Sequence, residues 1–133
     1  MGQFAQVRHL SIAIACRPAQ VYEYVANPEN LPKWAAGLGT DVHRAGEHWE
    51  VTTLQGIMTL RFAPQNELGV LDHYVQPPGA PEVHMPMRVL PNGDGSEIVV
   101  SLFRQPGMSD LTYSADAEMV RHDLETLKAL LEQ

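Results

Sequence analysis

Apolar and polar residues alternate at the start of the chain, over residues 7–15. This is the period of a β-strand with one buried face. A short helix is then predicted from Pro18 to the Asn27-Pro28 break, because the first turn of a helix tolerates proline. A second short helix is predicted over residues 28–36, before a glycine-rich break. The first part of the chain is therefore predicted to form one strand and two short helices.

The middle of the chain is a series of short alternating runs, each closed by turn residues. Six strands are predicted, over residues 40–45, 48–54, 57–63, 69–76, 82–90 and 96–105. Their connections are short, so neighbouring strands should pair antiparallel as a meander. Together with the first strand, they predict a sheet of seven strands.

The last part of the chain changes to a helical period. Ser109 and Ser114 are both possible N-caps, and acidic residues lie early in the segment. One apolar stripe follows at helical spacing and consists of Val120, Leu124, Leu127 and Leu131. A long amphipathic C-terminal helix is predicted.

This element order resembles that of the START/SRPBCC superfamily, which includes polyketide cyclases and dehydrases, lipid-transfer domains and plant pollen-allergen proteins. The segment from Ser11 to Trp34 is similar to the superfamily's start, where an apolar strand runs into a proline-led helix and then an Asn-Pro to Pro-x-Trp segment. The resemblance implies an α+β helix-grip fold, with a curved seven-stranded antiparallel sheet around the C-terminal helix and an apolar pocket between them. It covers residues 1–133 as a single domain. These motifs are structural, so the resemblance leaves function open.

Strand parity predicts which side chains enter that pocket, because the more apolar face of each strand should look toward the helix. The last strand leaves two registers open, one with Phe103 inward and the other with Arg104. The predicted ligand-binding residues are Trp34, Trp49, Met58, Leu60, Phe62, His73, Met85, Met87, Phe103 and Arg104. Val120, Leu124 and Leu127 of the helix close the pocket. Several methionines on one wall suit a variable ligand, although they could equally fill a core.

The alternation along its strand places the polar side chain of His73 toward the pocket. His73 is therefore the best catalytic candidate. An imidazole can move protons near neutral pH, and Arg104 or Tyr24 could polarise a carbonyl if either reached the same space. The alternative is a histidine that is bonded within the sheet or holds a ligand's polar end without chemistry. Asp72 falls on the opposite face of the strand, so the two should not act as a dyad.

Composition narrows the choice of partners. The chain has 133 residues, 44% of them hydrophobic, and a formal charge of −7 from 16 acids and 9 bases. These values fit one globular domain and argue against nucleic acid as a partner. No apolar run approaches the roughly 20 residues of a membrane span. The first residues lack the features of a signal peptide, so a cytoplasmic location is expected.

No cofactor or metal is expected. The six histidines form no HxH or HExxH motif, and no glycine-rich nucleotide motif follows a strand. The single cysteine, Cys16, cannot form an internal disulfide.

Three functions follow as hypotheses. The first is binding of a small hydrophobic or amphipathic molecule in the cavity between the sheet and the C-terminal helix. The second is a polyketide cyclase- or dehydratase-like enzyme acting in the same cavity, and the third is a protein-interaction module. The sequence leaves both a monomer and a homodimer open.

Overall fold

The computed structural model describes residues 3–35, 39 and 41–133. The predicted end of the second helix at residue 36 and the predicted strand start at residue 40 lie outside the described residues. The helical elements are α1 (Pro18–Val25), the 3-10 turn η1 (Pro28–Asn30), α2 (Leu31–Trp34) and α3 (Asp110–Leu131). The strands are β1 (Val7–Ile14), β2 (Asp41–Ala45), β3 (His48–Thr53), β4 (Gly56–Phe62), β5 (His73–Gln76), β6 (Val83–Met85), β7 (Met87–Asn92) and β8 (Gly95–Phe103).

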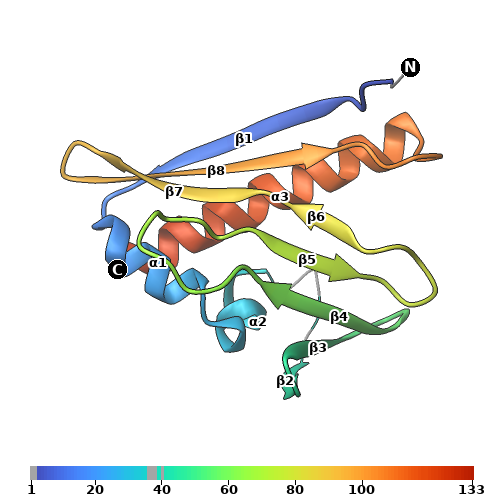
Figure 1. Ribbon diagram of the computed structural model, residues 1–133. Helices are drawn as coiled ribbons and strands as arrows, with labels where there is room; N and C mark the ends of the chain where they lie inside the picture. Colours follow the sequence, from blue (N-terminus) through green and yellow to red (C-terminus); the bar gives the residue numbers. More distant parts are fainter. Residues whose placement is uncertain (1–2, 36–38, 40) are drawn as a thin grey trace.

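The long helix α3 runs along one face of the strands, and α1 and α2 lie toward one end of it (Figure 1). Ser109 is the N-cap of α3, where its hydroxyl accepts a hydrogen bond from the Thr112 N–H at 3.1 Å, so Ser114 lies inside the helix. Leu124 and Leu127 of the predicted stripe are buried, and Val120 and Leu131 pack partly buried against the same core. The prediction of a long amphipathic helix is confirmed.

The prediction of one seven-stranded sheet is wrong. The described strands form two antiparallel sheets, with strand orders β1-β8-β7 and β2-β3-β4-β5-β6. The predicted strand over residues 82–90 breaks at Pro86, which has no N–H to donate to a neighbouring strand. The segment before the break pairs with β5 and the segment after it pairs with β8. One chain segment thereby passes from one sheet to the other.

The predicted strand over residues 69–76 is also shorter than expected, because β5 begins only at His73. Just before it, the buried Asp72 turns its carboxylate toward the break in the other strand. It accepts hydrogen bonds from the Met87 N–H at 3.0 Å and from His84 Nε2 at 2.9 Å, and Arg88 lies 3.6 Å away. Asp72 therefore ties the two sheets together where their hydrogen-bond ladders separate.

The environment of Asp72 favours the ionised form. Burial alone would raise the pKa of its carboxyl, but the Met87 and His84 hydrogen bonds and the charge of Arg88 outweigh burial and hold this pKa below its usual value. Tyr74 stacks on the His84 ring, with 4.6 Å between centroids. The Asp72 group is thus a fully partnered polar cluster.

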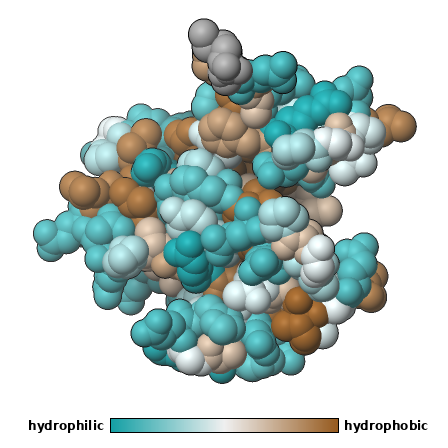
Figure 2. Space-filling view, turned by 45° about the vertical axis from the view of Figure 1, so that its right-hand side comes forward, coloured by the Kyte–Doolittle hydropathy of each residue, from teal (hydrophilic) through white to brown (hydrophobic). Residues whose placement is uncertain are grey.

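One face of the molecule is mainly polar. On the face drawn in Figure 2, hydrophilic side chains predominate and hydrophobic ones lie in small separate groups. Within the described part of the chain, no helix has both the length and the apolar character needed to cross a membrane.

Candidate ligand site

A small hollow lies between the five-stranded sheet, β7 and β8 of the other sheet, α2 and α3. The described residues that line it are Leu31, Trp34, Ala35, Leu60, Phe62, His73, Val75, Met85, Met87, Val100, Val120, Asp123 and Leu124. Its volume is about 60 Å³, which is room for about two water molecules at roughly 30 Å³ each. Ordinary ligand pockets measure roughly 300–1,000 Å³. The space at the predicted pocket position is therefore far smaller than an ordinary ligand pocket.

Trp34 gives this hollow a polar group without a partner. Its side chain comes from α2 and is 7% exposed, and its Nε1 atom has no hydrogen-bond partner among the described residues. A buried donor left unpaired costs about 1–3 kcal/mol, and native structures pair nearly all such groups. The indole N–H is available to an acceptor that enters the hollow.

His73 contributes an imidazole from the start of β5. Its Nδ1 atom lies 3.1 Å from the Leu71 carbonyl oxygen, and its ring packs against Phe62 at a centroid distance of 5.1 Å. Burial lowers the pKa of the imidazole, which favours the uncharged ring. When Nδ1–H donates to Leu71, Nε2 is left as an acceptor.

Asp123 is the functional candidate that sequence reasoning missed. It lies on α3, is 8% exposed and lines the hollow. Burial raises the pKa of its carboxyl to about 6, the charge of His122 lowers it to a smaller extent, and no hydrogen bond from a described group contributes. Its spacing of three residues from Val120 and four from Leu127 places it beside the apolar stripe, so a helical projection that included polar residues could have found it.

Six of the ten predicted pocket residues line the hollow: Trp34, Leu60, Phe62, His73, Met85 and Met87. Trp49 and Met58 instead pack in the main core, outside the lining. Tyr24 also packs against this core outside the lining, and burial raises the pKa of its hydroxyl.

Phe103 and Arg104 do not reach the hollow, which corrects both predictions. Along β8, Ile98, Val100 and Leu102 are the buried positions, so Phe103 falls on the opposite face and is 40% exposed. Arg104 follows the strand and holds the connection to α3. Its guanidinium donates to the Met108 carbonyl at 2.7 Å and pairs with Asp110 at 2.6 Å.

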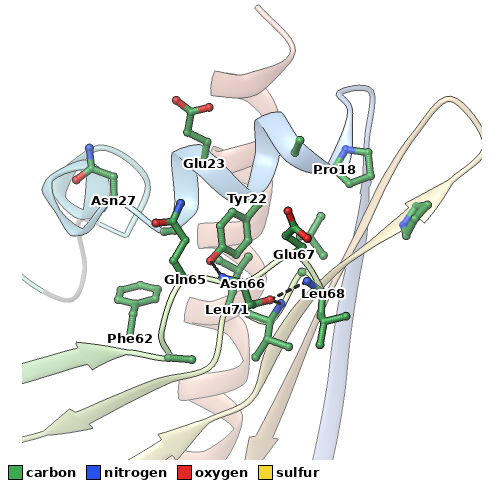
Figure 3. A pocket seen from close by; sticks show the side chains of 17 residues that line it. Pro18, Tyr22, Glu23, Asn27, Phe62, Gln65, Asn66, Glu67, Leu68 and Leu71 are labelled. Carbon is green, nitrogen blue, oxygen red and sulfur yellow. Dashed lines mark hydrogen bonds between the residues drawn. The ribbon is translucent and has the colours of Figure 1, made fainter.

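A larger, open groove of about 820 Å³ lies between α1, the segment 62–71 and β7. Figure 3 shows the Tyr22 side chain reaching from α1 to this segment, where its hydroxyl oxygen accepts a hydrogen bond from the Asn66 N–H at 3.0 Å. The side-chain oxygen of Asn66, Oδ1, accepts hydrogen bonds from the N–H groups of Leu68 and Val70. Phe62 lines both the groove and the hollow. The groove is larger, but Tyr22 and Asn66 already have partners within the protein.

Comparison with known proteins gives no sequence-level relative. No family model matches the chain, and no curated protein does. Solved structures do match. An uncharacterised protein from Bacillus thuringiensis superimposes with a TM-score of 0.77 at 14% identity, covering 96% of this chain and 100% of that one. The chain shares its fold with this protein.

Two further structures agree with this fold. A START superfamily protein from Mycobacterium smegmatis matches with a TM-score of 0.72 at 13% identity, covering 96% of this chain and 97% of that one. The Aha1 dimer from Colwellia psychrerythraea gives a TM-score of 0.74 at 13% identity, with 96% of each chain covered. The resemblance to the START/SRPBCC superfamily is thus confirmed at the level of the fold.

Proposed function

We propose that this helix-grip domain binds a small hydrophobic molecule carrying one polar group, in the hollow between the sheet and α3. The observation that supports this most is the unpartnered indole N–H of Trp34 in a mostly apolar hollow. An apolar body would cover the wall, and an acceptor on the ligand would satisfy the indole. His73 and Asp123 supply the other polar contacts.

The volume of the hollow limits the size of the ligand. A hollow of about 60 Å³ is smaller than the roughly 150 Å³ cavity that holds one benzene molecule, so even a short branched chain or a single small ring requires the hollow to widen. The flexible side chains of Met85 and Met87 are the wall elements best suited to that. The first ligands to test are therefore compact ones.

The two tryptophans of the chain allow a direct test. Nitrogen-15 spectra resolve one indole N–H signal for each of Trp34 and Trp49, assigned with Trp34→Phe and Trp49→Phe. A library of compact apolar molecules with one polar group is then titrated. Hits should shift the Trp34 signal and leave Trp49, which lies outside the lining, nearly unchanged. Equal shifts at both signals, or none at either, would contradict binding in the hollow.

An enzymatic role is the second candidate, because the hollow contains both an imidazole and a carboxyl. Asp123 as carboxylate could remove a proton next to a carbonyl, while the Trp34 N–H stabilised the enolate oxygen. The test is deuterium exchange into 3-methylbutan-2-one, followed by NMR. Native protein should accelerate exchange, and both Asp123→Asn and His73→Ala should slow it. Exchange that is unaffected by Asp123→Asn removes this mechanism.

The remaining hypotheses stay predictions. The Aha1 structure from Colwellia psychrerythraea is a dimer, and a homodimer of this chain remains open beside a monomer. The cytoplasmic location, the lack of a cofactor and the protein-interaction alternative likewise rest on sequence reasoning.

A further inference from the structure

Two polar groups of opposite hydrogen-bonding character line the hollow, and no described residue forms a hydrogen bond with either of them. Trp34 Nε1–H can only donate, and it has no partner among the described residues. The Asp123 carboxylate can only accept, and no described group hydrogen-bonds to it. Both line the same space of about 60 Å³. A single compact head group that reached both would have to accept one hydrogen bond and donate another.

Few head groups can do this. A carbonyl or a carboxylate offers only acceptors, and a protonated amine offers only donors, so each leaves one of the two groups unpaired. A primary amide carries both functions but needs two separate heteroatoms. A hydroxyl donates one hydrogen bond and accepts others through a single heavy atom. A hydroxyl therefore matches the polarity of the hollow with the smallest head group.

The charged groups around the hollow also favour a hydroxyl over a carboxylate or an ammonium group. Asp123 and His73 are the titratable groups among the described lining residues, and α2, β7 and β8 add only apolar side chains and the Trp34 indole. His122, on α3 itself, is the neighbouring charge that acts on Asp123. A carboxylate ligand would meet an ionised Asp123 in an apolar space, where like charges repel strongly. An ammonium group would pair with Asp123 but would be desolvated there and would leave Trp34 unsatisfied.

We infer, building on the function proposed above, that the hollow selects a small apolar alcohol or phenol. Its hydroxyl donates to the Asp123 carboxylate and accepts from Trp34 Nε1–H. The hydrocarbon part lies against the side chains of Met85, Met87 and Leu60, which line the hollow. His73 Nε2 is a second acceptor that a rotated hydroxyl could use.

The test compares four molecules with the same branched chain: 3-methylbutan-1-ol, the matching thiol, the matching amine and 3-methylbutanoate. Dissociation constants are measured at pH 8 from the carbon-13 methyl signals of Met85 and Met87. The alcohol should bind about tenfold more tightly than the thiol, which has nearly the same shape but forms much weaker hydrogen bonds. The amine and the carboxylate should bind more weakly than the alcohol.

The outcomes separate this inference from the proposed function. If the thiol or the amine binds as tightly as the alcohol, the hollow is a ligand site but selection of a hydroxyl is wrong. If none of the four perturbs these methyl signals, the proposed function fails, and this inference fails with it.

Two tryptophan variants test whether the Trp34 indole causes the preference for the alcohol over the thiol. Trp34→Phe removes the donor and should bring the alcohol's advantage over the thiol down to about threefold or less. Trp49→Phe alters a tryptophan outside the lining and should preserve the tenfold advantage. The methyl readout works in both variants because it does not depend on an indole. An unchanged advantage in a folded Trp34→Phe variant would overturn the role of the indole.

Discussion

Two aspartates with the same exposure, 8%, lie in opposite environments. Asp72, at the junction of the two sheets, accepts from Met87 and His84 and lies beside Arg88. Asp123, on α3, faces the apolar hollow, and no hydrogen bond from a described group supports it. The pKa of Asp72 lies below its usual value, whereas burial raises that of Asp123 to about 6.

This contrast separates a structural carboxylate from one available to a ligand. A buried charge with several partners stabilises the geometry around it, while a buried charge without partners destabilises the fold unless something binds to it. Burial alone would not distinguish the two residues. The environment, rather than residue type or exposure, identifies the hollow around Asp123 as the candidate site.

The largest expected effect is at Asp72. Asp72→Ala leaves the Met87 N–H, His84 and Arg88 without their shared acceptor and should lower the free energy of unfolding by about 3 kcal/mol. Urea unfolding at pH 7 measures this. Asp41→Ala, at an exposed position of the β2 edge strand, is the control and should change stability by about 0.5 kcal/mol or less. A similarly small loss at Asp72 would show that the junction does not depend on its carboxylate.

The effect at Asp123 should have the opposite sign. Asp123→Asn removes a charge that no described group hydrogen-bonds and should raise the free energy of unfolding at pH 8 by about 2 kcal/mol. Glu125→Gln removes the same charge from an exposed position of the same helix and should have a much smaller effect. Destabilisation by Asp123→Asn at pH 8 would mean that the carboxylate has partners in solution.

The pH dependence should distinguish the two aspartates as well. The pKa of Asp123 is raised in the folded state, so its protonated form stabilises the fold below about pH 4, and this contribution is lost as the pH rises through about 6. The advantage of Asp123→Asn should therefore grow between pH 4 and pH 7.

Asp72 should behave in the reverse way, because its folded-state pKa is lowered. Its stabilising contribution is present above the ordinary value of 3.8 and is lost as the pH falls through the lower folded-state pKa. The cost of Asp72→Asn should shrink in acid. Unfolding curves from pH 3 to pH 8 test both trends, and parallel profiles for the two variants would contradict the distinction between the residues.

Much of the fold could be predicted because its signals are local. Alternation identified the strands, and the apolar stripe identified α3. The alternating pattern did not predict that the sheet divides at Pro86. A proline in such a run is also compatible with an edge strand or a bulge. The inward parity of Leu60, His73 and Met87 was visible in the sequence, and these residues do line the hollow.

The site itself was less predictable. Asp123 was not predicted as a site residue because the stripe on the C-terminal helix was defined by its apolar residues alone. The orientation of Arg104 depends on its bonds to Met108 and Asp110, which form only once the loop before α3 is folded. Neither the volume of the hollow nor the unpartnered state of the Trp34 indole can be derived from a hydrophobic pattern, because both depend on how neighbouring side chains pack.

The central claim is that the ligand site is the small hollow and not the larger groove beside Tyr22 and Asn66. A crystal structure of the chain grown with 3-methylbutan-1-ol tests it most directly. We expect one alcohol molecule in the hollow, with its oxygen within hydrogen-bond distance of both Trp34 Nε1 and the Asp123 carboxylate. Alcohol density confined to the groove, with the hollow empty, would contradict the account.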